Sequence, residues 1–327
     1  ASKQLYGGSI TQFTQTFKNF GWEAELVDIH DLNAVERAIL EPEVAVLFAE
    51  RLANPDGTIT DIEALSKLAN GAQIPLLIDN TMATSVMCKP GVFGADVVLY
   101  STTKFMSGHG NALGGAVVDT GSFDWMSARH SSLLTDPNPA YHGIRFAETF
   151  GKLSYITFCH ASVLRDLGPT MAPMNAFLTL TGIETLPLRM RQHNENAAKV
   201  AHFLRDHKVV ADVSWAGFSD SPYYERAKKY LAFGAGSVFT FVVKDGYYAG
   251  QKLVENCNLL SHLANIGDTR SLIIHPASTT HRQLTDTQRE QAGIGAGTIR
   301  VSIGIENPND IIADLEGALE VVSGEKF

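Results

Sequence analysis

The sequence predicts an α/β fold built on a mostly parallel central sheet, followed by a smaller C-terminal α+β domain. Short apolar segments alternate with amphipathic helical patterns through the first half, the order expected of parallel strands joined by helices. Polar residues follow several of these segments directly. The second half mixes strands and helices without that alternation, which favours a separate domain.

The strands expected in the first half are short and largely apolar, as in a sheet covered on both faces. They are residues 25–28, 44–48, 76–78, 97–100 and 115–118. Helices are expected between them at 32–40 and at 61–69, where Thr60 or Asp61 can cap the N-terminus and Gly71 ends the helix.

The middle of the chain changes character. Residues 123–151 are rich in Ser, His, Pro and Asn without a clear period, which predicts an irregular excursion. A long helical pattern runs over 174–206 and is interrupted at Pro187. We place a large domain at 1–185 and a smaller one at 186–327, with strands at 238–243, 271–274 and 299–303 and a last helix at 310–321.

Composition limits the classes of function. The chain has 327 residues, 45% of them apolar, and a formal net charge of −9, so nucleic acid is not expected as a partner. Membrane association is not expected either, because no apolar run approaches the length that spans a bilayer. Three widely spaced cysteines, Cys88, Cys159 and Cys257, suit free thiols in the cytoplasm better than a disulfide framework.

Three polar candidates follow separate predicted strands. Asp79 follows 76–78, Ser101 to Lys104 follow 97–100, and Asn54 lies in the loop after 44–48. Ligands bind beyond the carboxyl ends of strands in open sheets of this kind, so these side chains are expected at one edge.

The run Ser101-Thr102-Thr103-Lys104 carries the most specific chemistry. A lysine there can form a Schiff base, neighbouring hydroxyls can hold a phosphate, and Asp79 can pair with a pyridinium nitrogen. Together they match pyridoxal 5'-phosphate (PLP). Taken singly, Lys104 reads as a surface lysine and Asp79 as a turn cap. A dinucleotide loop is excluded, since no G-x-G-x-x-G opens a helix here.

Two further residues have a structural and a functional interpretation. Tyr6 before Gly7-Gly8 is either a turn residue or a ring that stacks on a cofactor and moves protons. Arg300, inside the apolar run 299–303, either pairs with Glu306 or binds a substrate carboxylate. For His275 and His281 we favour ordinary loop histidines over metal ligands, because no third ligand is evident.

The chain resembles the Cys/Met-metabolism PLP-dependent enzymes over essentially its whole length. The matching motifs, in family order, are Leu5-Tyr6-Gly7-Gly8-Ser9, Asn54-Pro55, Ile78-Asp79-Asn80-Thr81, Ser101-Thr102-Thr103-Lys104, Ser107-Gly108-His109-Gly110, the run 275–281 and the run 299–304. The resemblance implies an aspartate-aminotransferase-type PLP fold and favours the functional interpretations of Lys104, Asp79, Tyr6 and Arg300.

The resemblance also implies roles for individual residues. Lys104 would carry PLP and transfer protons, Asp79 would pair with the ring nitrogen, and Tyr6 would stack on the ring and act in catalysis. Ser101 and Thr103 would bind the phosphate. Arg300 and Ser271 would hold the carboxylate of an amino acid substrate, and Asn54 would lie near both ring and carboxylate.

Within this family, the runs 121–125, 164–168 and 261–268 look most like O-acetylhomoserine sulfhydrylases. Gly8 replaces the cysteine typical of methionine γ-lyases. We therefore expect transfer of sulfide or methanethiol onto O-acetylhomoserine, giving homocysteine or methionine and acetate. Cystathionine γ-synthase, γ-lyase and O-succinylhomoserine sulfhydrylase remain alternatives, as does an inactive scaffold.

The resemblance implies a cytoplasmic homotetramer, a dimer of dimers. Family members carry two phosphate-binding segments ahead of Tyr6, a helix start and a Tyr-x-Arg stretch, and neither is found in this sequence. We therefore expect a proteolysed or incomplete protein whose parent is active and whose present form is impaired.

Overall fold

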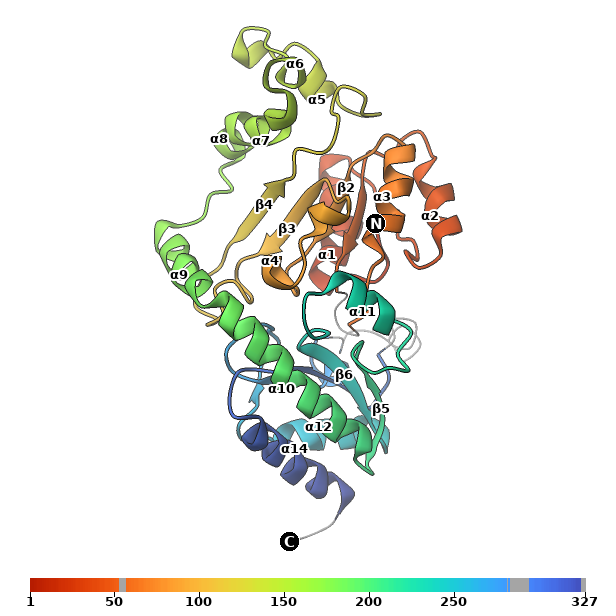
Figure 1. The fold of residues 1–327 in the computed structure, drawn as a ribbon, viewed down its shortest axis with the longest axis vertical. Helices are drawn as coiled ribbons and strands as arrows, with labels where there is room; N and C mark the ends of the chain where they lie inside the picture. Colours follow the sequence, from red (N-terminus) through yellow and green to blue (C-terminus); the bar gives the residue numbers. More distant parts are fainter. Residues whose placement is uncertain (53–56, 281, 283–293, 325–327) are drawn as a thin grey trace.

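The computed structural model describes residues 1–52, 57–280, 282 and 294–324. Its strands form two sheets, one four-stranded in the order β1-β2-β3-β4 and one five-stranded in the order β5-β6-β9-β8-β7. Figure 1 shows the first sheet in the upper half of the molecule and the second in the lower half, with the helix α10 (Leu186–Asp206) running from below the first sheet down along the second.

The first sheet contains β1 (Leu47–Glu50), β2 (Leu76–Asp79), β3 (Val97–Ser101) and β4 (Gly115–Asp119). The first three strands are parallel and β4 pairs antiparallel with β3, which confirms the mostly parallel arrangement. Leu47, Leu76, Ile78 and Val97 are almost fully buried, as the apolar runs predict for a sheet covered on both faces.

Two expected strands differ from the structure. Residues 25–28 form no strand, because Val27 makes only an isolated β-bridge, to Ser2 near the start of the chain. The strand expected at 44–48 begins only at Leu47. Val44 donates to the carbonyl of Glu41 in a turn, and the ladder starts where Leu47 donates to Pro75.

The second sheet contains β5 (Val210–Ser214), β6 (Val238–Val243), β7 (Ser261–His262), β8 (Leu272–Ile274) and β9 (Thr298–Ser302). β9 pairs antiparallel with both β6 and β8, and this places Arg300 opposite Thr240 and Ile274. The three strands expected from the sequence in this region are confirmed to within a residue or two.

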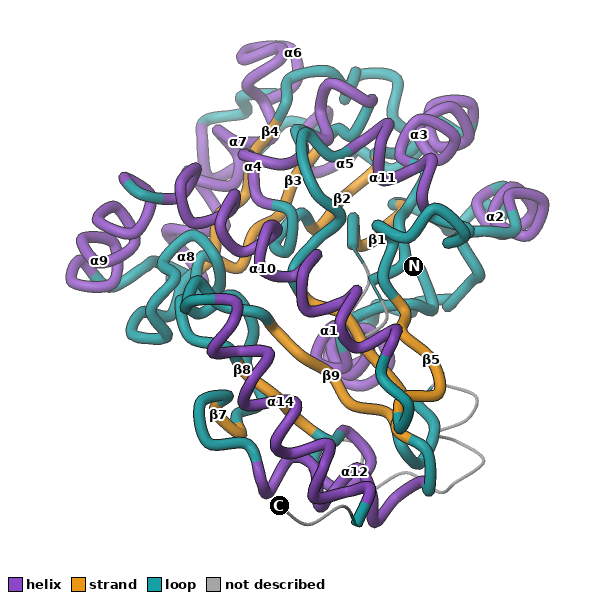
Figure 2. Tube along the Cα trace, turned by 60° about the horizontal axis from the view of Figure 1, so that its bottom comes forward, coloured by secondary structure: helices purple, strands orange, loops and turns teal. Residues whose placement is uncertain are grey.

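The helices with their bounds are α1 (Gly7–Thr11), α2 (Leu32–Ile39), α3 (Ile62–Gly71), α4 (Thr84–Met87), α5 (Ser132–Thr135), α6 (Phe146–Phe150), α7 (Ser154–Phe158), α8 (Arg165–Leu167), α9 (Pro173–Glu184), α10 (Leu186–Asp206), α11 (Tyr224–Tyr230), α12 (Gly246–Asn256) and α14 (Pro308–Ser323). Both views show α12 and α14 together beside the second sheet (Figures 1 and 2).

The expected helices in the first and last parts of the chain form. Asp61 caps α3 by accepting a hydrogen bond from the backbone N–H of Ala64. The long helical pattern breaks at Thr185, and Pro187 then lies in the first turn of α10. Proline is tolerated there because the N–H it lacks would have no partner inside the helix.

The excursion expected at 123–151 is not wholly irregular. It contains α5, α6 and a 3-10 turn, Pro139–Tyr141, around a small apolar cluster of Leu134, Phe146 and Ala147. In Figure 1 this part and α7–α8 project beyond the first sheet. The helices are too short to show a period in the sequence, which explains why the pattern did not reveal them.

Candidate active site between the two sheets

The carboxyl ends of β1, β2 and β3 meet the second sheet at one pocket. Because the three strands are parallel, Glu50 lies in register with Asp79, and Ser101 ends the next strand. Residues 264–266 and Arg300 complete the wall from the second sheet. The pocket is lined by Tyr6, Glu50, Leu52, Asp79, Thr81, Met82, Ser101, Lys104, Ala264, Asn265, Ile266 and Arg300.

Hydrogen bonds fix the ends of β2 and β3 against each other. The Asp79 Oδ1 atom accepts from the backbone N–H of Thr81 at 2.8 Å. The Thr81 hydroxyl in turn accepts from the backbone N–H of Ser101 at 2.7 Å. The turn after β2 therefore sets the position of both the carboxylate and the serine.

Lys104 projects from the turn after β3 into this pocket. Burial lowers the pKa of its amine below the ordinary value, and the positive charge of Arg300 lowers it further. Its Nζ donates to Oδ1 of Asn265 at 2.5 Å. Because of the lowered pKa, more of the amine is neutral near pH 7, the form needed for attack on a carbonyl.

Asp79 has the opposite shift. Burial raises the pKa of its carboxyl group above the ordinary value of 3.8, and the hydrogen bonds from Thr81 only partly oppose that effect. The side chain would therefore gain from a cationic partner inside the pocket.

Arg300 and Tyr6 both line the pocket, although they come from opposite ends of the sequence. Arg300 is 9% exposed and donates to the carbonyl of Asn265 at 3.2 Å. Burial lowers the pKa of its guanidinium to about 10. The Tyr6 side chain is 54% exposed, and its backbone N–H donates to Glu50 at 2.7 Å.

Two predicted site residues are not brought into the pocket. The Thr103 hydroxyl exchanges hydrogen bonds with the backbone of Gly114. Ser271 is fully buried, donates its hydroxyl to Glu306 and accepts from the N–H of Gly304. Glu306, which the sequence offered as an ion-pair partner of Arg300, accepts hydrogen bonds from the N–H and the hydroxyl of Ser271. Asn54 lies outside the described residues.

Of the two histidines singled out in the sequence, the structure describes His275. His275 is buried, with ring hydrogen bonds to Ser278 and to the carbonyl of Ala296. His281 lies outside the described residues. In the part of the chain that the structure describes, no group of three His, Cys, Asp or Glu residues could hold a metal ion.

Sequence reasoning gave no role to three polar residues of the pocket, Glu50, Thr81 and Asn265. Glu50 ends β1 as Asp79 ends β2, so its place after an apolar run was a usable signal. Asn265 lies in an irregular segment between β7 and β8 and has no periodic pattern to mark it.

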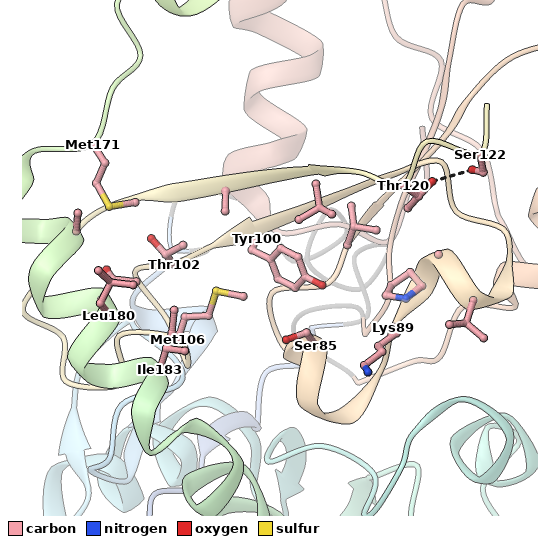
Figure 3. Close-up of a pocket in the computed structure, with 18 residues that line it drawn as sticks. Ser85, Lys89, Tyr100, Thr102, Met106, Thr120, Ser122, Met171, Leu180 and Ile183 are labelled. Atoms are coloured by element: carbon pink, nitrogen blue, oxygen red, sulfur yellow. Dashed lines mark hydrogen bonds between the residues drawn. The ribbon is translucent and has the colours of Figure 1, made fainter. Parts of the chain in front are cut away.

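A second, larger cavity of about 820 Å³ lies on the other side of β3 and β4. Figure 3 shows Leu180 and Ile183 of α9 beside Thr102 and Met106 at one end of it, and Ser85 and Lys89 at the other, with Tyr100 between the two ends. Its lining is mostly apolar and includes neither Lys104 nor Asp79. The chemistry outlined above is therefore restricted to the smaller pocket.

Comparison with known proteins gives the family. A model of the Cys/Met metabolism PLP-dependent enzymes matches residues 1–320. The O-acetyl-L-homoserine sulfhydrylase of Leptospira meyeri is 42% identical over 98% of this chain and 74% of its own length.

Solved structures agree. A crystal structure of a putative O-acetylhomoserine (thiol)-lyase from Campylobacter jejuni, which contains N'-pyridoxyl-lysine-5'-monophosphate, matches with a TM-score of 0.92 and 39% identity. That match covers 98% of this chain and 76% of the other. Cystathionine γ-lyase from Lactobacillus plantarum matches with a TM-score of 0.81 and 31% identity, over 98% and 75% of the two chains. The predicted fold class and resemblance are confirmed, and the chain belongs to the Cys/Met metabolism family of PLP-dependent enzymes.

Proposed function

We propose that this chain catalyses γ-replacement on O-acetylhomoserine with sulfide or methanethiol, giving homocysteine or methionine and acetate. The C–O bond at the γ carbon breaks, acetate leaves, and a C–S bond forms in its place. Similarity to the Leptospira meyeri sulfhydrylase and to the Campylobacter jejuni structure supports this choice of substrate.

The residues of the pocket fit PLP. Asp79 is half-buried and the pKa of its carboxyl group is raised, so a pyridinium nitrogen would stabilise its ionised form. Lys104 has a lowered pKa, so its amine would react readily with an aldehyde. Tyr6 offers a ring and Ser101 a hydroxyl at the same pocket. When bound, PLP supplies an electron sink for carbanions at the α carbon.

Roles for the side chains follow from these positions. Lys104 would take the proton from the α carbon and return it, because the lowered pKa of its half-buried amine leaves more of it neutral near pH 7. Arg300 would bind the substrate carboxylate through its planar fork. Thr103 and Ser271 would have to exchange their present hydrogen bonds before they contacted a ligand, so we give them no direct role.

One observation carries the proposal: Asp79, Lys104 and Arg300 line one pocket although they are far apart in sequence. We expect an absorbance band when PLP is added and its loss in Lys104→Ala. Lys89→Ala is the matched control, since Lys89 lines the other cavity and should keep the band. A band that persists in Lys104→Ala would exclude this lysine as the attachment point.

The second candidate is a cystathionine γ-lyase or γ-synthase activity, which the match to the Lactobacillus plantarum enzyme favours. Product analysis separates the two. Homocysteine formed from O-acetylhomoserine and sulfide supports the first proposal. Cleavage or synthesis of cystathionine without sulfhydrylation supports the second candidate. A preference for O-succinylhomoserine over O-acetylhomoserine as the ester substrate would indicate an O-succinylhomoserine sulfhydrylase.

We also propose that the protein assembles as a homotetramer in the cytoplasm. Within each chain, we propose a domain boundary between residues 185 and 186. The two sheets lie on either side of that division in sequence. Exposed apolar side chains on α9, among them Met174, Phe177 and Leu180, suit a subunit contact. None of the helices in the described residues is both long and apolar enough to cross a membrane. Light scattering of the purified protein would measure the assembly.

A further inference from the structure

Asn265 contacts both cationic side chains of the pocket. Its side-chain Oδ1 atom accepts from Nζ of Lys104 at 2.5 Å, and its main-chain carbonyl accepts from Nη2 of Arg300 at 3.2 Å. Lys104 follows β3 of the first sheet, whereas Arg300 lies on β9 of the second. A single residue therefore joins the two groups for which we propose proton transfer and carboxylate binding.

The segment that carries Asn265 is itself held in place. The N–H of Gly267 donates to the hydroxyl of Ser302 on β9 at 3.0 Å. Gly267 has a φ of +72°, and a Cβ there would lie 2.7 Å from the backbone nitrogen of Phe105. Only glycine fits so close to the residue after Lys104. The position of Asn265 is thus set from both sheets before any ligand binds.

We infer that Asn265 is a positioning residue that holds the free amine of Lys104 in the pocket through its side chain and is tied to Arg300 through its main chain. This inference rests on the proposed function of Lys104. An amide oxygen accepts hydrogen bonds and carries no charge, so it can orient the amine without trapping it as a salt bridge. The lysine thus stays aimed at the reacting carbon whenever it is not bonded to the cofactor.

The two contacts can be separated by substitution. Replacing the side chain removes the bond to Lys104 but leaves the main-chain carbonyl for Arg300. We expect Asn265→Ala to lower kcat about tenfold, the loss typical of a hydrogen bond to a charged group, while KM for the amino acid changes less than about twofold. Asn258→Ala is the matched control, because Asn258 is an exposed asparagine just before β7.

A second measurement uses the full chain before PLP is added. Acylation of Lys104 by an amine-selective reagent, followed by peptide mass spectrometry across pH, reports the fraction of neutral amine. Asp79, Glu50, Tyr6 and Arg300 are the other ionisable side chains at this pocket, and they are the same in all variants. Only the group at position 265 changes.

The two variants should move the acylation midpoint in opposite directions. Asn265→Asp puts a carboxylate beside the amine and should raise the midpoint by about one pH unit or more. Asn265→Ala removes an acceptor that favours the ammonium form and should lower it. The same direction in both variants, or no shift in either, would overturn the inference.

The failure of this inference can be told apart from failure of the proposed function. If Lys104 does not carry PLP, the absorbance band survives in Lys104→Ala whatever position 265 does. If Lys104 carries PLP but Asn265 does not position it, the band is lost in Lys104→Ala while the acylation midpoints and kcat of the Asn265 variants stay at the parent values. Thermal melting of each variant checks that it is folded.

Discussion

At the scale of single residues, Asp79 is held in an environment that suits its charge only when a cation is present. Burial raises the pKa of its carboxyl group, and a folded-state pKa above the unfolded one means that ionisation disfavours folding. This loss of stability is absent when the pH is below the ordinary pKa of 3.8, and it is complete once the pH exceeds the raised pKa of Asp79.

We therefore predict that Asp79→Asn stabilises the protein without PLP at neutral pH and disables it as an enzyme. The asparagine can still accept the hydrogen bond from Thr81. Its melting temperature should exceed that of the parent at pH 7 and converge with it toward pH 3. Activity should fall on the order of a hundredfold, because the electrostatic support for the ring nitrogen is lost. A lower melting temperature at pH 7 would contradict the argument.

His193 gives the opposite dependence on pH. It is fully buried on α10, its Nδ1 pairs with the carbonyl of Ile303, and burial lowers its pKa to about 4 from 6.5. A depressed pKa means that stability is complete above pH 6.5 and is lost as the pH falls toward 4. The shift corresponds to about 3 kcal/mol.

We predict that the free energy of unfolding falls between pH 6.5 and 4 and that His193→Asn flattens this fall. The asparagine amide can take the place of Nδ1 toward Ile303, although the smaller side chain lowers stability at every pH. Urea denaturation at several pH values measures both effects. An equally steep fall in the variant would assign the acid sensitivity to other groups.

At the scale of elements, α9 packs directly on the turn that carries Lys104. A Cβ added at Gly182 would lie 2.3 Å from the carbonyl oxygen of Ser107 and 2.6 Å from that of Met106. Both atoms are backbone, so they cannot rotate away as a side chain would. The helix and the turn can approach only because residue 182 has no side chain.

Gly182→Ala should therefore destabilise the protein by roughly 1–3 kcal/mol, although alanine favours a helix. Gly317→Ala is the matched control in the middle of α14, where an added Cβ meets nothing within 4 Å. That variant should be more stable by about 1 kcal/mol. Chemical denaturation of the two variants measures the difference between their free energies of unfolding. Equal changes in both would show that helix propensity alone decides their stability.

At the scale of the whole molecule, Arg189 ties α10, which lies along the second sheet, to the Lys104 turn. This buried guanidinium on α10 donates to the carbonyls of Phe105, Met106 and Gly182. It also donates to the hydroxyl of Thr185 at the break before α10. One side chain thus donates to three carbonyls in two elements, and the carbonyl of Gly182 also accepts from the hydroxyl of Thr185.

Arg189→Met keeps a long unbranched side chain but removes the guanidinium donor from all three carbonyls. We predict a loss of about 3 kcal/mol in the free energy of unfolding. Arg191→Met is the control on the same helix. Its guanidinium is exposed and contacts only the ring of Phe233 among the interactions described, so about 1 kcal/mol or less is expected. A similar loss in both variants would contradict the bridging role.

Local patterns were sufficient for several elements. The apolar runs at 76–78, 97–100 and 115–118 became strands, and the cap at Asp61 began α3, because an apolar run and a helix cap can be recognised from residues adjacent in sequence. The strand expected at 25–28 did not form. Its pairing with the start of the chain is limited to one isolated bridge, between Val27 and Ser2, and the apolar pattern could not show how short that pairing is. Asp79, Ser101 and Lys104 meet because parallel strands share a carboxyl edge.

The sequence alone thus determined the fold class, the family and the polar residues at the ends of β2 and β3, because strand pattern and motif order are local properties. Only the tertiary structure decided which side chains share a pocket. It brought Asn265 onto Lys104 across 161 positions of sequence, and it turned Thr103 and Ser271 toward other partners. Such contacts depend on how two sheets pack, and no spacing along one strand or helix encodes that packing.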